Sequence, residues 1–417
     1  MLDRAIASGP AIKADLLKAP VVQAPSASQA SAGRLLVMAH FVYAGRVGGA
    51  EHMLYNLLRG FSHEPVGLTV ACATRANLDP TMADELDTMP GVQLVETGGR
   101  GPRFIAEQAA CLNPSLAGEA TLFPNYFVPP VLPSRLGRVA VVLHDLQYRH
   151  FPANFSAGKR AWLTASQGFA VRRADQVITI SQFVADDAAR CFGAGVARRT
   201  MVIPNPISWE RFGDSSEPAF IERPYVLTVA AQYPHKNLET LLRAFARLAA
   251  TDPNPMLVLC GQDYGGLRGV AAGDGATGRG GLRPMLEALD LGERVIMTGY
   301  LDDAALGRWY RHAAMFAFPS VFEGFGMPAV EALGFGLPVL TTRCTALPET
   351  TLGLAVYVKD PYGEQEWASH MTAILRNPAA FRPSPDKVER LRSHYSVGRV
   401  ARLYLRACGL SPSSDIA

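Results

Sequence analysis

Short apolar runs alternate with longer amphipathic stretches along the chain from residue 34 onward. Most of these runs lack polar alternation, which indicates strands whose two faces are both covered by helices. Strands that alternate with helices along a chain are typical of βαβ units around a parallel sheet. In the first half, strands are expected at 35–39, 67–73, 92–95, 121–123, 139–143, 177–180 and 201–203.

The pattern lapses at residues 209–224, a polar stretch that contains prolines, and then starts again. Such a lapse is where a linker between domains is expected. In the second half, we expect strands at 225–229, 256–260, 294–297, 315–318, 339–341 and 355–358, with helices at 238–250, 281–290, 302–312, 328–335 and 362–376. The second half therefore repeats the architecture of the first.

These patterns predict an α/β protein with two Rossmann-like domains, at residues 34–212 and 225–394, joined by a linker at 213–224. Residues 1–33 are rich in Ala, Ser, Pro and Gln and lack sustained periodicity, which predicts a disordered leader. A last periodic element at 395–411 is expected to be a helix with an apolar face. The pattern leaves open which domain this helix packs on.

The composition agrees with two domains and excludes several function classes. A chain of 417 residues is too long for one ordinary core. No uncharged apolar run reaches 18 residues, so any membrane contact is expected to be peripheral. A formal charge of +3 is too small to favour nucleic-acid binding. The six cysteines form no CxxC pair, and the first residues lack the apolar stretch of a secretory signal, so we expect reduced thiols and a cytoplasmic location.

One local excess of positive charge stands out between Arg135 and Asp175. This stretch has seven Lys or Arg residues against two acids, with Phe151, Phe155 and Trp162 interleaved. It has two interpretations: a solvated helix face, or a surface that meets anionic lipid or a phosphate-bearing acceptor.

The strongest chemical signal is the segment FPSVFEGFGMPAVEALG, which begins at Phe318. A strand is expected to end at Phe318, a loop with Gly324 and Gly326 follows, and a helix opens with Pro328 at its first position. Loop glycines let backbone approach a ligand, and free N–H groups at a helix start bind anions such as pyrophosphate. We therefore expect the segment 324–327, with Phe325 and Met327, to bind a phosphate-bearing ligand.

Two carboxylates bracket this segment. Glu323 precedes the loop, and Glu331 is expected in the first turn of the helix, where acids are also common as simple helix-capping residues. A carboxylate can accept two hydrogen bonds, which suits the vicinal hydroxyls of a ribose or a hexose. One carboxylate can thus reach the sugar side of a bound diphosphate and the other the nucleoside side.

The string from Glu323 to Glu331 resembles the E-x7-E motif of the retaining GT-B glycosyltransferases, specifically family GT4. The resemblance extends over residues 35–410 and implies the GT-B fold, with two Rossmann-like domains facing across a cleft. It implies that Glu323 hydrogen-bonds the hexose of a nucleotide diphosphate sugar and that Glu331 hydrogen-bonds the ribose.

The strand expected at 225–229 leads into AAQYPHKNL, which resembles the family segment whose lysine neutralises the donor diphosphate. The resemblance assigns that role to Lys236. Many members also have an arginine five residues earlier, where this chain has Ala231, so a second cation is missing or comes from elsewhere. Taken alone, a lysine before a helix is most often solvated surface.

Two landmarks of the first half also resemble the family. Gly48 and Gly49 open a helix, as in the family's GGxE loop near the donor phosphate and the acceptor, and their spacing does not fit a dinucleotide-binding GxGxxG. His144 follows the strand at 139–143, at a strand end where open α/β sheets place ligand groups. The resemblance implies that His144 orients the hexose and supports the transition state; a buried structural histidine is the alternative.

Three further positions match the family, but their residues suit local structure as well. Ser181 and Asn205 could equally serve caps and turns, and the role of Glu349 is left open. The glycine-rich stretch 265–281 lacks the ending of a P-loop and is expected to be a surface loop.

The resemblance implies transfer of a hexose, with mannose from GDP-mannose as the first hypothesis, to a glycan or polyprenyl-diphosphate-linked acceptor. UDP-glucose, a GDP-deoxysugar, a nucleotide-sugar epimerase or hydrolase, and a non-catalytic binder are the alternatives. No DxD motif or His/carboxylate cluster at ligand spacing is present in the sequence, so neither metal nor other cofactor is expected.

Overall fold

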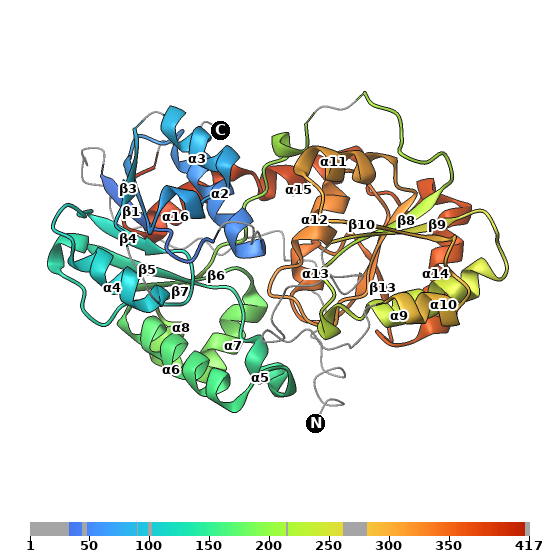
Figure 1. Cartoon of the computed structure of the whole chain (residues 1–417), viewed down its shortest axis with the longest axis horizontal. Coiled ribbons are helices and arrows are strands. Elements are labelled where there is room, and N and C mark those ends of the chain that lie inside the picture. Colours follow the sequence, from blue (N-terminus) through green and yellow to red (C-terminus); the bar gives the residue numbers. More distant parts are fainter. Residues whose placement is uncertain are drawn as a thin grey trace. The chain divides into compact units, whose positions relative to one another are not determined.

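The computed structural model describes residues 33–43, 48–89, 91–98, 102–213, 216–261 and 282–412. Residues 1–32 of the expected leader and the glycine-rich stretch 265–281 lie outside the described residues. The described chain forms two compact units (Figure 1). The first unit holds most of residues 33–207 together with 394–412, and the second holds residues 208–393.

The first unit is built on a parallel sheet with the strand order β3-β2-β1-β4-β5-β6-β7 among its described residues. The strands β1 and β5 carry aliphatic residues that are almost all buried, because helices cover both faces of the sheet. The strands are β1 Arg34–Met38, β2 Gly67–Cys72, β3 Val92–Glu96, β4 Ala120–Phe123, β5 Arg138–Leu143, β6 Gln176–Thr179 and β7 Thr200–Val202.

The helices of the first unit follow its strands in the βαβ manner (Figure 1). They are α2 Gly49–Phe61, α3 Pro80–Thr88, α4 Arg103–Leu112, α5 Gln147–His150, α6 Ala157–Arg173, α7 Gln182–Phe192, α8 Ala194–Ala197 and α16 Val397–Ala407. The C-terminal helix α16, whose partner the sequence left open, packs against α2.

The contact between α16 and α2 requires a glycine. A Cβ atom at Gly60 would lie 2.6 Å from the Cβ atom of Ala401 and from the carbonyl oxygen of Val397, closer than side chains approach. Tyr404 is fully buried in the same contact, with its hydroxyl 4.0 Å from the Sδ atom of Met53. The last helix is therefore part of the core of the first unit.

The second unit repeats this plan with a parallel sheet in the order β10-β9-β8-β11-β12-β13. Its strands are β8 Tyr225–Val229, β9 Met256–Cys260, β10 Val295–Gly299, β11 Met315–Phe318, β12 Val339–Thr342 and β13 Val356–Val358. Its helices are α9 Leu238–Ala249, α10 Arg283–Ala288, α11 Asp303–His312, α12 Met327–Gly334, α13 Leu347–Thr350, α14 Glu364–Arg376 and α15 Pro385–His394. The sequence pattern did not predict α13 or α15.

Residues 208–212, which the sequence pattern assigned to the first domain, pack in the second unit. The indole N–H of Trp209 donates to the carbonyl oxygen of Arg392, and a Cβ atom at Gly334 would lie 2.2 Å from the Trp209 ring. The ring of Phe212 packs edge-on against Tyr310 and Phe335. Phe212 is buried and Trp209 is half-buried, and both belong to the second unit because their partners are there.

All six cysteines are free thiols, and Cys191 and Cys344 are half-buried while the other four are buried. Among the described residues, no helix is long and apolar enough to span a bilayer.

Candidate functional site

Lys236 and Glu323 meet at the carboxyl edge of the second sheet. Lys236 follows β8 and Glu323 follows β11, which lie side by side at the point where the strand order reverses. Open α/β sheets bind their ligands at this switch point. Lys236 Nζ lies 2.5 Å from Glu323 Oε1, with the two side chains 17% and 12% exposed. Lys236 and Glu323, which the sequence analysis assigned to one diphosphate sugar, are therefore in contact in the structure.

The lysine segment is fixed by the turn that starts α9. Asn237, directly after Lys236, has a left-handed backbone with φ 52°, a conformation that asparagine tolerates better than most residues. Its side-chain amide donates to the carbonyl oxygens of Pro319 and Pro361 at 3.3 and 2.9 Å. Its side-chain oxygen accepts from the Thr240 hydroxyl at 2.7 Å. The backbone of Lys236 is therefore held next to a rigid turn.

A second set of bonds joins the lysine segment to the glutamate segment. The carbonyl oxygen of His235 accepts from the N–H of Val321 at 2.8 Å and from the Ser320 hydroxyl at 3.1 Å. Burial lowers the pKa of His235 to about 3, and the neighbouring Lys236 charge adds to this effect. The imidazole of His235 is consequently neutral, and the lysine is the cation of this segment.

Thr345, in the loop after β12, holds the backbone of Glu323. The N–H of Glu323 donates to Thr345 Oγ1 at 2.8 Å, and the same hydroxyl donates to the Glu323 carbonyl oxygen at 2.9 Å. Thr345 has φ 51°, which is unusual for a β-branched residue and costs free energy. The threonine therefore uses a strained backbone to fix both polar backbone groups of Glu323.

The loop before α12 contains the remaining predicted phosphate-binding residues. Gly324, Phe325, Gly326 and Met327 are all buried, and the Phe325 carbonyl oxygen accepts from the Thr350 hydroxyl at 2.6 Å. Gly326 caps the helix with φ 82°. The helix thus begins at Met327, one residue earlier than predicted, and Pro328 is its second residue, where a missing N–H is still harmless. The positive end of α12 can bind an anion.

The position predicted for Glu331 was partly wrong. It lies beyond the first turn of α12, since the helix starts early, and it is 3% exposed. Its Oε1 atom is 2.5 Å from Arg211 Nη2, and its Oε2 atom accepts from the Tyr310 hydroxyl at 3.1 Å. Burial raises the pKa of Glu331, while the Arg211 charge lowers it.

Sequence reasoning missed Arg211, Tyr310 and Thr345. Arg211 lies at the edge of the stretch interpreted as linker, where a charged residue gives no signal of its own. Tyr310 belongs to the apolar face of α11, where an aromatic residue is expected for packing alone. Thr345 lies in a loop after β12. The ion pair joins Arg211 to Glu331, 120 positions apart in the chain, and such a long-range contact leaves no local sequence pattern.

In the first unit, Gly48 and Gly49 open α2 as predicted. The N–H of Gly48 donates to Glu51 Oε2 at 3.0 Å. Burial raises the pKa of Glu51. No atom of the described residues would lie within 4 Å of a Cβ atom at Gly49, so these residues leave room beside the start of this helix. An incoming group can therefore approach the backbone there.

His144 lies directly after β5 and is half-buried. Its Nε2 atom is 2.8 Å from the carbonyl oxygen of Pro124, which can only accept. Burial lowers the pKa of His144, so the ring is neutral, with its proton on Nε2 and a lone pair on Nδ1. Such a ring can accept a hydrogen bond from a hydroxyl. Ser181, in contrast, accepts from the N–H of Val184 at 3.3 Å and caps α7.

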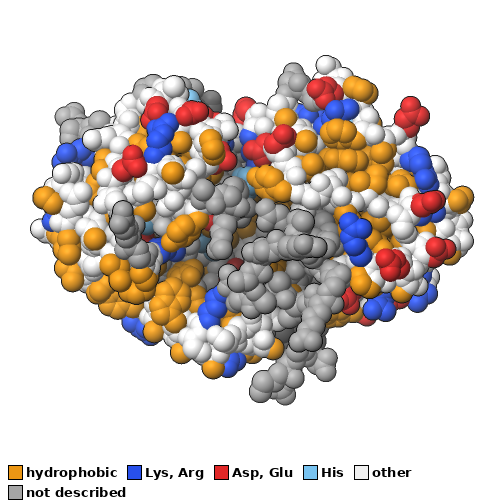
Figure 2. Space-filling model, in the orientation of Figure 1, with side chains coloured by type: hydrophobic (Ala, Val, Ile, Leu, Met, Phe, Trp, Pro, Cys, Tyr) orange, Lys and Arg blue, Asp and Glu red, His pale blue; other side chains and the backbone are white. Residues whose placement is uncertain are grey.

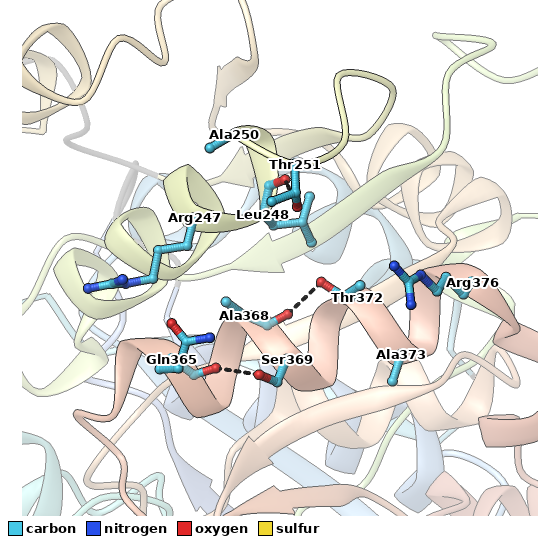
Figure 3. Close-up of a pocket in the computed structure, with 10 residues that line it drawn as sticks. All are labelled: Arg247, Leu248, Ala250, Thr251, Gln365, Ala368, Ser369, Thr372, Ala373 and Arg376. Carbon is cyan, nitrogen blue, oxygen red and sulfur yellow. Dashed lines mark hydrogen bonds between the residues drawn. The ribbon is translucent and has the colours of Figure 1, made fainter.

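A surface groove of about 570 Å³ lies between α9 and α14 (Figure 3). The residues that line it are not among the predicted site residues. Its serine and threonine hydroxyls bond to their own helix: Ser369 donates to the carbonyl oxygen of Gln365 and Thr372 to that of Ala368. Arg247, at one end of the groove, pairs with Glu364. The groove therefore offers few unpaired polar groups to a ligand.

Within the described part of the chain, no three His, Cys, Asp or Glu side chains come together in a group that could hold a metal ion.

The chain is similar to known glycosyltransferases in both halves. Residues 47–211 match the family model described as Glycosyltransferase Family 4, and residues 214–392 match Glycosyl transferases group 1. The chain is 25% identical over 242 residues to the O-antigen chain mannosyltransferase RfbU of Salmonella typhimurium, which is 58% of this chain and 62% of that protein. It is 25% identical over 268 residues to the O-antigen chain mannosyltransferase B of Escherichia coli, which is 61% of this chain and 64% of that protein.

These matches span less than two thirds of either relative's own length. Among solved structures, Anabaena Alr3699/HepE in complex with UDP and glucose is similar over 90% of this chain and 99% of that chain, with a TM-score of 0.65 and 16% identity. This likeness shows the fold. With both family models matched and two Rossmann-like units present, the chain belongs to the GT4 family of glycosyltransferases and has the GT-B fold.

Proposed function

We propose that this protein is a retaining glycosyltransferase that moves a hexose from a nucleotide diphosphate sugar to a glycan or lipid-linked acceptor. The observation that carries the proposal is the contact between Lys236 and Glu323 beside the N-terminus of α12. A cation, a carboxylate and the N-terminus of a helix at one sheet edge provide the groups that a diphosphate bound to a sugar requires.

In the proposed reaction, the bond between the sugar C1 atom and the diphosphate oxygen breaks while the acceptor oxygen bonds C1 from the same face. The acceptor proton passes to the leaving phosphate oxygen. Lys236 and the N–H groups around Phe325 and Met327 stabilise the charge that develops on the diphosphate. Each such preorganised donor is typically worth about 3 kcal/mol of barrier.

The remaining predicted residues have binding roles in this proposal. Glu323 accepts hydrogen bonds from hexose hydroxyls, and Glu331 accepts them from the ribose. His144 accepts a hydroxyl hydrogen bond at Nδ1. Gly48 and Gly49 let a phosphate or an acceptor group approach backbone. The proposal needs no metal, because Lys236 and the helix N-terminus supply the positive potential, and we expect turnover to persist in EDTA.

For the donor, we propose GDP-mannose. Two relatives named as O-antigen chain mannosyltransferases support this choice. The similarity to a protein solved with UDP and glucose makes UDP-glucose the competing donor. A panel of nucleotide sugars in a thermal-unfolding assay decides between them, because a donor at 100 times its Kd stabilises the folded state by about 2.7 kcal/mol. A chain that none of them stabilises contradicts the proposal.

For the acceptor, we propose a polyprenyl-diphosphate-linked glycan reached at the cytoplasmic face of a membrane. The helix α6 supports this choice, because its seventeen residues contain Lys159, Arg160, Arg172 and Arg173 and no acid. Trp162 and Phe169 on the same helix are 45% and 42% exposed. In Figure 2, hydrophobic side chains gather over the region that α6 occupies in Figure 1, with basic side chains beside them.

Basic residues around exposed aromatic rings favour an anionic lipid surface. Co-sedimentation with vesicles of phosphatidylglycerol and phosphatidylcholine tests this assignment. We expect binding that weakens with added salt and is reduced by the double variant Arg172→Gln/Arg173→Gln, while the matched variant Arg243→Gln/Arg247→Gln on α9 binds as wild type. Equal binding to pure phosphatidylcholine argues against the surface.

The transfer reaction itself is tested with the stabilising donor and a polyprenyl-diphosphate-linked acceptor. Mass spectrometry is expected to show one added hexose, and NMR the anomeric configuration of the donor. Release of free sugar or formation of an epimer without acceptor supports the hydrolase or epimerase alternative instead.

A further inference from the structure

Arg211 and Glu331 form a buried ion pair inside the second unit. The side chains are 5% and 4% exposed, and Arg211 Nη2 lies 2.5 Å from Glu331 Oε1. The other terminal nitrogen of Arg211 binds Asp303 at 2.8 Å, and the guanidinium lies 4.2 Å from the centre of the Phe212 ring. The planar guanidinium is thus held on several sides, so its direction is fixed.

The second oxygen of Glu331 has its own donor. The hydroxyl of Tyr310, a residue that is itself fully buried, lies 3.1 Å from Oε2. Each oxygen of the carboxylate therefore has one protein donor. A carboxylate has about four lone-pair positions, so two acceptor positions remain. Their directions are set by Arg211 and Tyr310.

We propose that Arg211 is a positioning residue for nucleotide recognition: it orients the Glu331 carboxylate so that its remaining lone pairs accept the two ribose hydroxyls. This inference rests on the proposed function, which assigns Glu331 to the ribose, and it adds a residue from outside the E-x7-E string. The buried arginine also provides the charge partner of Glu331, since an unpaired carboxylate would be costly there.

The pair also opposes protonation of Glu331. Burial raises the pKa of Glu331, the Arg211 charge and the Tyr310 hydroxyl lower it, and the Asp303 charge raises it. A protonated Glu331 would lose an acceptor position that the ribose needs. Without Arg211, the preference for a ribonucleotide over its 2′,3′-dideoxy form should therefore fall as the pH falls, and it should fall less in the wild type. The comparison cancels the titration of the diphosphate, which both ligands share.

The test measures binding of UDP and GDP, and of their 2′,3′-dideoxy forms, by titration calorimetry. For Arg211→Met we expect the better of the two ribonucleotides to bind about tenfold more weakly, because charge-assisted hydrogen bonds are lost. The dideoxy form should bind to Arg211→Met nearly as tightly as it binds to the wild type. The ratio of the ribonucleotide affinity to the dideoxynucleotide affinity should therefore fall toward one. In Arg211→Met, the remaining preference for the ribonucleotide over the dideoxy form should also fall from pH 8 to pH 6, and by more than in the wild type.

Arg211→Lys keeps the buried positive charge, so it provides a second test if Arg211→Met does not fold. We expect an intermediate preference for ribose, because a lysine cannot hold Glu331 and Asp303 with one planar fork. Arg247→Met, which removes an exposed arginine on α9, should match the wild type.

Two outcomes separate the two proposals. If the wild type binds neither UDP nor GDP, the proposed function fails. If the wild type binds one of them and the folded Arg211 variants keep its full preference for ribose with no pH dependence, the role of Arg211 is overturned and the proposed function stands.

Discussion

Lys236 Nζ and Glu323 Oε1 lie 2.5 Å apart although 87 positions separate the two residues in the chain. The contact joins the ends of β8 and β11, the two strands on either side of the topological switch point. Before donor binds, each charge is therefore the partner of the other. A bound diphosphate would give Lys236 a more strongly charged partner, and it would leave Glu323 able to accept from a hexose.

Lys236→Met should lower kcat by 100- to 1,000-fold, roughly the loss seen when one preorganised charge stabiliser of a transition state is removed. Initial rates of sugar transfer at saturating donor check this value. The fold should survive, because the lysine is partly exposed and Glu323 can then reach water. Lys359→Met, at an exposed lysine of the same unit, should keep the wild-type rate, and an equal loss in both variants would contradict the assignment.

Thr345→Val should destabilise the second unit and slow transfer. The substitution keeps the shape of the side chain but removes the hydroxyl that bonds both the N–H and the carbonyl oxygen of Glu323. The N–H of Glu323 then loses this acceptor, whereas its carbonyl oxygen still accepts from the N–H of Ala346 at 3.4 Å. We therefore expect a loss of about 1–3 kcal/mol, the typical cost of one buried group left unpaired. Urea unfolding measures the loss. Thr345→Ser retains the hydroxyl and should recover most of the stability; a serine variant as unstable as the valine variant would show that the methyl group matters instead.

The sequence predicted the strands well because they are buried on both faces. The strands β8, β9 and β11 begin and end at the predicted residues, since an apolar run bounded by polar loops marks both ends of such a strand. Lys236 and Glu323 could be placed near each other because both follow strands of one parallel sheet. The helix α15 was missed because only Leu391 of its ten residues is buried, so it has almost no apolar periodicity.

The environment of Glu331 could not be predicted from local sequence. Its partners come from a 3-10 turn at 210–212 and from α11. The sequence pattern assigned residues 208–212 to the first domain, because the polar stretch that follows them marked the linker at 213–224. Trp209 and Phe212 are the aromatic residues that anchor this segment to the second unit, yet two isolated aromatics in a polar stretch show no period. Contacts of this kind depend on the tertiary fold and appear only with coordinates.

Gly326→Ala should lower the stability of the second unit by about 1–3 kcal/mol, the usual cost of a strained backbone, and also lower donor affinity. The residue has φ 82°, and a Cβ atom there would lie 2.6 Å from Leu347 Cδ2. Thermal unfolding with and without nucleotide separates the two effects. As a control, Gly292→Ala adds a methyl group in open space without a left-handed backbone. Similar losses at both glycines would remove the special role of Gly326.

His40 should make the first unit less stable in mild acid. It is 2% exposed and its Nε2 atom is 2.8 Å from the Thr97 hydroxyl. Burial, with a smaller effect of Arg103, lowers the pKa of His40 from 6.5 to about 4. Between these two values the unfolded chain binds a proton that the folded chain does not, so the free energy of unfolding falls as the pH drops. The full difference amounts to about 3 kcal/mol below pH 4.

His40→Gln removes this proton, so its unfolding free energy should depend less steeply on pH between 6.5 and 4 than that of the wild type. Calorimetric unfolding at a series of pH values provides the comparison. As a control, His63→Gln replaces an exposed histidine of the same unit, and its curve of unfolding free energy against pH should be parallel to that of the wild type. The half-buried His235 and His394, whose pKa values desolvation lowers to about 3 and about 4, contribute in the same direction in every variant. The difference between His40→Gln and wild type therefore isolates His40, and parallel curves would mean that His40 is protonated in the folded protein.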